Sequence, residues 1–473
     1  MTPDMKLHHR RCLLAVMGLL LGAGALAQPR SGASVPAPAP APIILVHGNG
    51  DSDASWQTVI WRFESNGWPS ARLHALAFPY PLARDDDAVA QPGRSSTADA
   101  VAYLAAEVDR VLARTGARQV ILIGSSRGGN AIRNYLQGEG TRAAATVKVS
   151  HAILCGTPNH GVFALPGWRE GSEFSGTGAF LRALNAPKNG AGDEVADSVK
   201  WMTLRSDSND KYAQPFLLGP DGKRMPSNVS YAGPELKGAH NVVIAGIDHR
   251  ETAFGPAAFA EIYRFITGTA PPGTAIVAQR AIILSGTITG LGLDVHDAAS
   301  GDFVNNLPLA GARLAIYALD AASARRSGRA RYQARIGADG QWGPFRAHSG
   351  VRYEFEIAAP GYATSHIYRS PFLRSSAVIS MAAQRIAPAD QDAGAIVTLT
   401  RARGYLDAGR DRMQFDGKPV AGLPPAGAVL AESTLKLPEQ RARTISALFN
   451  GERLLGRTWR AADKHLTTLA ITD

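Results

Sequence analysis

The most informative stretch of the sequence runs Val120-Ile121-Leu122-Ile123-Gly124-Ser125-Ser126-Arg127-Gly128-Gly129-Asn130. Its four apolar residues predict a buried strand, and the apolar spacing of residues 131–136 predicts a helix. Between them lies a Gly-x-Ser-x-Gly motif centred on Ser126. A serine on a tight strand-to-helix turn is exposed above the sheet, with a helix N-terminus behind it that favours developing negative charge. The stretch predicts a nucleophile elbow, and a flexible Gly/Ser turn is the alternative.

A second strand-to-turn motif lies near the N-terminus, where Ile43-Ile44-Leu45-Val46 is followed by His47-Gly48-Asn49-Gly50. A turn of this kind after an early strand supplies one of the two amides that bind an oxyanion beside a nucleophile elbow. The expected donors are the backbone N–H groups of Asn49 and Arg127. We expect His47 to brace the turn, and a plain strand-to-helix turn is the alternative.

Strand and helix patterns alternate over the first 270 residues. This alternation predicts an α/β fold with a doubly wound, mostly parallel sheet and helices on both faces. Besides the two strands already named, the sequence predicts strands at 72–80, 149–155, 199–204 and 241–245, and helices at 56–63, 98–112 and 256–266.

An acid and a histidine follow the elbow in the order that a serine triad requires. The loop at 205–210 carries two candidate acids, Asp207 and Asp210. We favour Asp210 because it precedes an apolar residue and a proline in the pattern common after this strand. His249 follows the last strand, at 241–245, and is the expected general base.

The N-terminal segment resembles an export signal rather than a folded element. Basic residues precede the apolar run 13–21, and Ala25-Leu26-Ala27 resembles a cleavage site. We expect a signal peptide at 1–27, a Pro/Ala-rich leader at 28–42, and a secreted or periplasmic mature protein. The apolar run is too short for a stable transmembrane anchor.

Composition limits the other function classes. The chain has 473 residues and a formal net charge of +10, and its basic residues are spread out rather than interleaved with aromatics, which argues against nucleic-acid binding. Signal cleavage would leave Cys155 as the one cysteine, so no intramolecular disulfide is expected. No metal-ligand spacing stands out, so we expect no metal, and the triad needs no cofactor. The oligomeric state is not assigned.

The pattern changes after Pro271-Pro272-Gly273 to short alternating strands separated by Gly and Asp turns. We expect an α/β catalytic domain at 43–270, followed by a β-sandwich-like C-terminal region. This region divides into a β domain at 278–396 and further β structure at 397–473, which together can also form one domain.

Four motifs together carry a family resemblance: VHGNG at 46–50, GSSRG at 124–128, GTPNHG at 156–161 and DHRET at 248–252. On these motifs, residues 42–268 resemble secreted bacterial and archaeal lipases of the compact α/β-hydrolase kind. Residues 286–362 resemble the Ig-like sandwich repeats of extracellular enzymes.

The resemblance implies a mechanism. Ser126 would attack an ester carbonyl, His249 would move the proton, and Asp210 would hold the imidazole. The amides of Asn49 and Arg127 would bind the oxyanion. The substrate would be a lipid or another ester, and the C-terminal β region would either contact lipid or stabilise the fold.

One residue departs from the family pattern. Arg127 stands where such lipases often carry Met, and a cation there is expected to favour substrates with a nearby carboxylate.

Two alternatives remain open. The first is an extracellular polyester depolymerase of the polyhydroxyalkanoate type, whose β region would rest on the polymer through exposed aromatics. The second is a catalytically silent hydrolase-like protein that binds a surface. The candidate aromatics are Trp342, Phe345, Tyr353 and Phe355.

Overall fold

The computed structural model describes residues 39–137, 148–207, 209–219, 221–290, 305–424 and 430–472. By its contacts the chain divides after Ala39, and Pro40–Asp473 forms one compact unit. The expected signal peptide and most of the leader lie outside the described residues. No helix in the part of the chain that the structure describes is long and apolar enough to cross a membrane.

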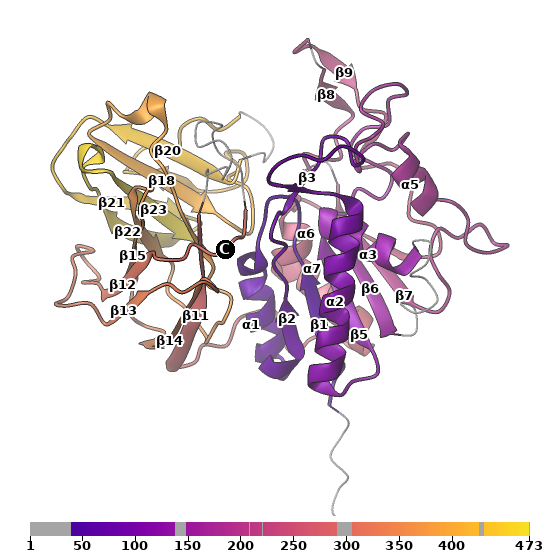
Figure 1. The fold of residues 1–473 in the computed structure, drawn as a ribbon, viewed down its shortest axis with the longest axis horizontal. Helices are drawn as coiled ribbons and strands as arrows, with labels where there is room; N and C mark the ends of the chain where they lie inside the picture. Colours follow the sequence, from indigo (N-terminus) through magenta and orange to yellow (C-terminus); the bar gives the residue numbers. More distant parts are fainter. Residues whose placement is uncertain are drawn as a thin grey trace, which may run out of the picture. The chain divides into compact units, whose positions relative to one another are not determined.

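A six-stranded sheet forms the first half of this unit (Figure 1), and all its neighbouring strands are parallel. This confirms the predicted α/β fold. The expected strand at 72–80 is much shorter than predicted. In spatial order the strands are β10 (His240–Ile244), β7 (Lys200–Ser206), β6 (Val149–Cys155), β5 (Val120–Ser125), β1 (Ile43–Val46) and β2 (Leu73–Ala75).

Helices cover both faces of the sheet because β1 is apolar at every position and β5 at its first four. In β1, Ile44 and Val46 face α2 (Thr97–Thr115) and α3 (Arg127–Gln137), whereas Ile43 and Leu45 face α1 (Gln57–Ser65) and α7 (Pro256–Thr267). Two hydrophobic cores result, one on each face. A strand buried on both faces has the continuous apolar sequence that the motifs showed.

Short elements complete this half. Most of them lie in the connections at the carboxyl ends of the strands, where a doubly wound sheet places its site. They are η1 (Asp53–Trp56), η2 (Ser70–Arg72), β3 (Leu82–Ala83), β4 (Arg94–Ser95), α5 (Ala179–Leu184), β8 (Phe216–Leu218), β9 (Arg224–Pro226) and α6 (Glu251–Phe254).

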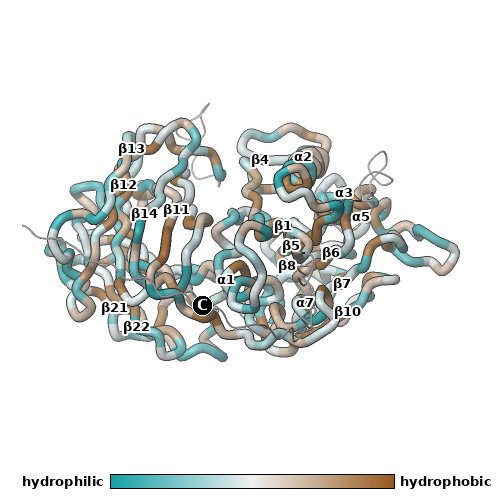
Figure 2. The backbone as a smooth tube through the Cα atoms, turned by 90° about the horizontal axis from the view of Figure 1, so that it is seen from below, coloured by the Kyte–Doolittle hydropathy of each residue, from teal (hydrophilic) through white to brown (hydrophobic). Residues whose placement is uncertain are grey.

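The second half consists of β structure. It contains a seven-stranded sheet and two three-stranded sheets, and each of the two small sheets packs against the large one through its own hydrophobic core. Figure 2 shows hydrophobic residues, in brown, along β11 (Ala281–Gly290). The other elements are β12 (Arg313–Ala318), β13 (Tyr332–Arg335), β14 (Gln341–His348), β15 (Tyr353–Ala358), β16 (Thr364–Arg369), β17 (Met381–Ala383), η3 (Pro388–Asp390), β18 (Ala395–Arg401), β19 (Met413–Phe415), β20 (Glu432–Leu437), β21 (Thr444–Phe449), β22 (Glu452–Arg457), η4 (Ala461–Asp463) and β23 (His465–Ile471).

The last strand joins the two expected parts of the β region. β23 lies between β16 and β18 and pairs in parallel with both, so the large sheet is continuous across residue 396. We therefore propose that residues 278–472 form one C-terminal β domain after a catalytic domain at 43–270.

The four aromatics considered for polymer binding are core residues. Trp342, Phe345, Tyr353 and Phe355 are at most 5% exposed and pack inside the first β core. The suggestion that they form an exposed platform was wrong. Alternation of large apolar and polar residues predicts that one face of a strand is apolar. Such a face usually packs in a core, and the alternation alone does not indicate that it is exposed to solvent.

The elbow depends on close packing between β1 and the start of α3. A Cβ added at Gly128 would lie 2.4 Å from the carbonyl oxygen of Val46 and 2.6 Å from that of His47. These atoms are backbone, so they cannot move aside without shifting the strand.

We expect Gly128→Ala to lower the free energy of unfolding by about 1–3 kcal/mol, because the added methyl group overpacks this contact. Gly190→Ala is the control, since nothing lies within 4 Å of the Cβ position there. Thermal unfolding measures both variants. Equal melting temperatures would contradict the contact.

Candidate active site

Ser126 has the backbone geometry of an elbow. Its φ is +51°, in the left-handed region that non-glycine residues rarely adopt. Its N–H donates to the carbonyl of Cys155 at 2.8 Å, which ties the turn to the neighbouring strand β6. The helix α3 begins at the next residue, so its N-terminus lies directly behind the serine.

The structure brings Asp210 and His249 together. Nδ1 of His249 lies 2.9 Å from Oδ2 of Asp210, and both side chains are 6% exposed. The amide of Tyr212 donates to the other carboxylate oxygen at 2.8 Å, and the Tyr212 ring packs edge-on against the imidazole. Asp210 is thus oriented by one amide and one imidazole.

Asp207, the competing acid, is used differently. Its carboxylate accepts the amide of Gly246 at 3.2 Å and that of Asn209 at 3.4 Å. These contacts tie the loop after β7 to the loop after β10. The geometry therefore favours Asp210 as the partner of the histidine.

The turn after β1 lies against the elbow because Val46 pairs with Gly124 in the sheet. A Cβ at Gly48 would lie 3.2 Å from Cβ of Ser126, so the backbone of Asn49 passes close to the serine. His47 braces the turn, as expected: its Nδ1 lies 2.8 Å from the Gly48 carbonyl, and its Nε2 accepts the amide of Phe78 at 2.9 Å. Burial lowers the pKa of His47 to about 4.

Arg127 does not present a cation to the site. Its guanidinium is buried and donates to both carboxylate oxygens of Glu173, at 2.9 and 3.0 Å, and to Pro81 and Ser95. The expectation that it favours substrates with a carboxylate was wrong. An arginine side chain is long enough to point either towards the site or away from it. Here it points away and anchors the segment that carries Glu173.

A cavity of about 730 Å³ lies beside Ser126 and His249. Besides the turn after β1, the elbow and the loops that carry Asp210 and His249, its walls include the segment after β6, the β8–β9 hairpin and the connection between β18 and β20. The last two of these were not predicted, because they reach the site only through the tertiary fold. The apolar lining residues are Val162, Phe163, Trp168, Phe174, Leu217, Leu218, Tyr405 and Leu430.

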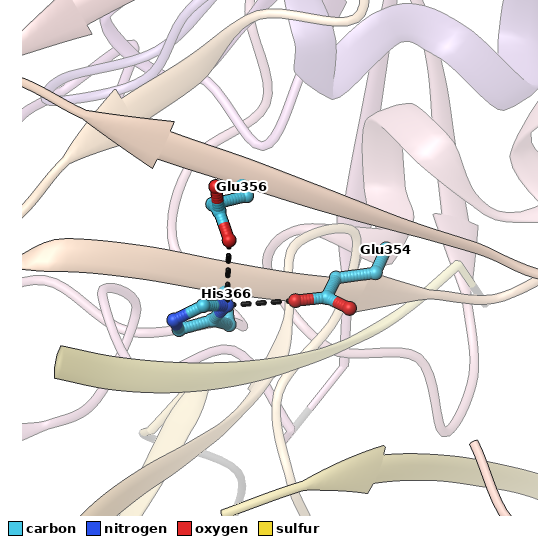
Figure 3. Close-up of side chains that lie close together, drawn as sticks. All are labelled: Glu354, Glu356 and His366. Atoms are coloured by element: carbon cyan, nitrogen blue, oxygen red, sulfur yellow. Dashed lines mark hydrogen bonds and ion pairs between the residues drawn. The ribbon is translucent and has the colours of Figure 1, made fainter. Parts of the chain in front are cut away.

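One cluster of metal-ligand types occurs among the described residues, away from the cavity (Figure 3). Ligand atoms of Glu354, Glu356 and His366 lie within 4.8 Å of one another. Arg326 donates to both carboxylates and so already supplies the positive charge that a metal ion would bring. Glu356 and His366 meet because β15 and β16 pair in register, a contact that sequence spacing cannot show. We interpret the cluster as a buried ion network.

Models of two known families match the chain. The model described as "Lipase (class 2)" matches residues 40–164, and the one described as "Lipase C-terminal domain" matches residues 280–386. The two matches support a lipase with an α/β-hydrolase core and a C-terminal domain. This confirms the resemblance inferred from the motifs.

Similar solved structures are more distant. Lipase B of Aspergillus fumigatus is 17% identical with a TM-score of 0.33. The match covers 50% of this chain and 54% of that chain, so this chain spans about half of its length. The mature lipase BlEst2 of Bacillus licheniformis is 20% identical with a TM-score of 0.33, over 50% of this chain and 95% of that chain. Phospholipase PlaB of Legionella pneumophila is 12% identical with a TM-score of 0.33, over 73% and 94%. No curated protein matches the sequence. These similarities are too distant to bear on substrate or mechanism.

The buried His47 makes stability depend on pH. Its pKa of about 4 lies below the ordinary value of 6.5, so between these pH values the unfolded chain binds more protons. We expect the stability of the wild type to fall as pH drops from 6.5 towards 4, with His47 contributing up to about 3 kcal/mol. His47→Gln should reduce the fall in melting temperature. His151, whose pKa burial also lowers to about 4, keeps its share in both proteins. The same pH dependence in both would contradict this role.

The buried pair of Arg127 and Glu173 provides a second test. Arg127→Met leaves the Glu173 carboxylate without its guanidinium, and we expect a loss of about 3–5 kcal/mol in the free energy of unfolding. The double variant Arg127→Met/Glu173→Met removes both charges and should regain much of that stability. Denaturation of both variants gives the comparison. A double variant as unstable as the single one would show that the pair is not the cause.

Proposed function

We propose that this protein is a lipase, a secreted serine carboxylester hydrolase that uses Ser126, His249 and Asp210. The observation that carries the proposal is the cavity: Ser126 and His249 line the same cavity, and Asp210 holds the far nitrogen of the imidazole at 2.9 Å. An oriented base beside a serine on an elbow is the arrangement that activates a hydroxyl.

The steps follow from these positions. Oγ of Ser126 attacks the ester carbonyl while Nε2 of His249 takes the hydroxyl proton, and the amides of Asn49 and Arg127 bind the oxyanion. The imidazolium then protonates the leaving alcohol as the C–O bond breaks. Water, deprotonated by His249, attacks the acyl-enzyme, and the acid leaves as Ser126 regains its proton.

The cavity favours an apolar acyl group. Phenylalanine, tryptophan and leucine side chains form much of its wall, and such surfaces bind hydrocarbon. Three of its charged residues are already paired: Arg250 with Asp51, and Arg169 with Asp85 outside the lining. We therefore propose a neutral lipid ester as substrate, bound partly by the β region through Tyr405 and Leu430.

The alternatives lose support. A polyester depolymerase would need an exposed aromatic surface, but the four aromatics proposed for that role are buried. A silent binding protein would have no need of an aligned acid, histidine and serine. The export signal at 1–27 supports secretion and rests on the sequence.

The decisive variants are Ser126→Ala and Asp210→Asn, with Asp207→Asn as the matched control in the same loop. On p-nitrophenyl esters from acetate to palmitate, we expect kcat to fall about 10⁴-fold or more for Ser126→Ala and Asp210→Asn. Asp207→Asn should stay within a few-fold of the wild type.

A long-chain optimum would identify a lipid substrate, and a short-chain optimum a small ester or a polyester. If Ser126→Ala matches the wild type, Ser126 is not the nucleophile. If Asp207→Asn is the inactive acid variant, the acid has been assigned wrongly.

A further inference from the structure

Asp248, the residue before His249, is fully buried and links the His249 loop (residues 245–250) to the β region. Its Oδ1 accepts the amides of Arg250 at 2.8 Å and Glu251 at 3.0 Å, which fixes the loop internally. Its Oδ2 faces the other way and accepts the amide of Tyr405 at 2.7 Å. Tyr405 belongs to the β18–β19 loop (residues 402–412), so one carboxylate joins the two loops.

Two arginines of the β region complete this link. Arg401, the last residue of β18, lies 3.3 Å from Oδ2 of Asp248 and 2.7 Å from Oε1 of Glu251. Arg410 lies 3.4 Å from the same Asp248 oxygen and 2.7 Å from Oε2 of Glu251, and it donates to the carbonyl of Gly246 at 3.2 Å. The two guanidinium groups therefore bind carboxylates on both sides of His249 in the sequence.

The carboxylates need these cations. Burial raises the pKa of Asp248, and the nearby Glu251 raises it further. A buried carboxylate stays ionised beside a second, part-buried one only where cations and N–H donors compensate them. Arg401 is itself 8% exposed, and its guanidinium packs over the Phe449 ring, so its position is fixed by the β region.

We propose that Arg401 and Arg410 are positioning residues for ester hydrolysis, acting on His249 through Asp248 and Glu251. This rests on the proposed function of His249 as the base. Neither arginine is among the described residues that line the cavity, so their effect falls on the position of the imidazole and not on substrate contacts. A misplacement of about 1 Å is enough to cost about 100-fold in rate.

Arg401→Met is the main variant, because its side chain keeps the apolar contact with Phe449 and loses the charge. Arg443→Met is the matched control: this arginine of the β region also binds a carboxylate through two nitrogens, that of Asp416 at 2.7 and 2.9 Å.

The substrate is p-nitrophenyl butyrate, and rates are expressed per serine titrated with a fluorophosphonate. We expect Arg401→Met to lower kcat about 10- to 100-fold with KM within about twofold. Arg401→Lys should restore part of kcat, and Arg443→Met should resemble the wild type.

A second readout does not depend on ester hydrolysis. The proton between Nδ1 of His249 and Asp210 gives a low-field proton NMR signal, assigned by its loss in His249→Gln. We expect Arg401→Met to weaken or shift this signal and Arg443→Met to leave it unchanged. If Arg401→Met does not fold, Arg410→Gln, at a side chain 29% exposed, tests the same link.

The outcomes separate the two proposals. The positioning role would be overturned if folded Arg401→Met showed both a wild-type kcat per titrated serine and an unchanged NMR signal. Where Arg410→Gln takes its place, the same two results in that variant would overturn it. If the wild type cleaves no ester, the proposed function fails, and the NMR signal alone decides whether the arginines hold His249.

Discussion

The approach of the α3 N-terminus to the end of β1 is the contact on which the site depends. Because Gly128 lies against the carbonyls of Val46 and His47, the elbow and the turn after β1 are held side by side by backbone contacts. The parallel sheet then brings the ends of β6, β7 and β10 to the same edge. Among the candidate residues, Asn49 follows β1, Ser126 follows β5, Asp210 follows β7 and His249 follows β10, so strand order and packing place the site before any side chain contributes.

Residues near a strand end were predictable for this reason. Ser126, Asp210 and His249 each follow a short apolar run, and a parallel sheet brings such positions together. Contacts made by long side chains were not predictable. The guanidinium of Arg127 points to a buried glutamate 46 residues later in the chain, and no local pattern distinguishes that direction from one towards the cavity.

The β region shows the same limit more strongly. Its strands were recognisable from alternation, but their pairing was not, because β23 joins β16 from 99 residues further along the chain. The buried aromatics and the cluster around Arg326 follow from that pairing. Segments of 6 or 7 residues carry little information about their partners, so residues such as Tyr405 could not be connected to the cavity from sequence.

Buried ion pairs recur where segments distant in sequence must hold one geometry. Arg127 with Glu173 fixes the segment beside the elbow, and Arg401 with Asp248 fixes the His249 loop. Such pairs contribute little net stability, because desolvation offsets most of their attraction, but breaking one leaves a buried charge. Two apolar surfaces can shift against each other with little loss of contact. A planar guanidinium that binds two carboxylates cannot shift without breaking directional hydrogen bonds. On the proposed role of His249, this difference explains why charged groups, and not more leucines, join the β region to the histidine: a base needs a fixed direction more than it needs additional stability.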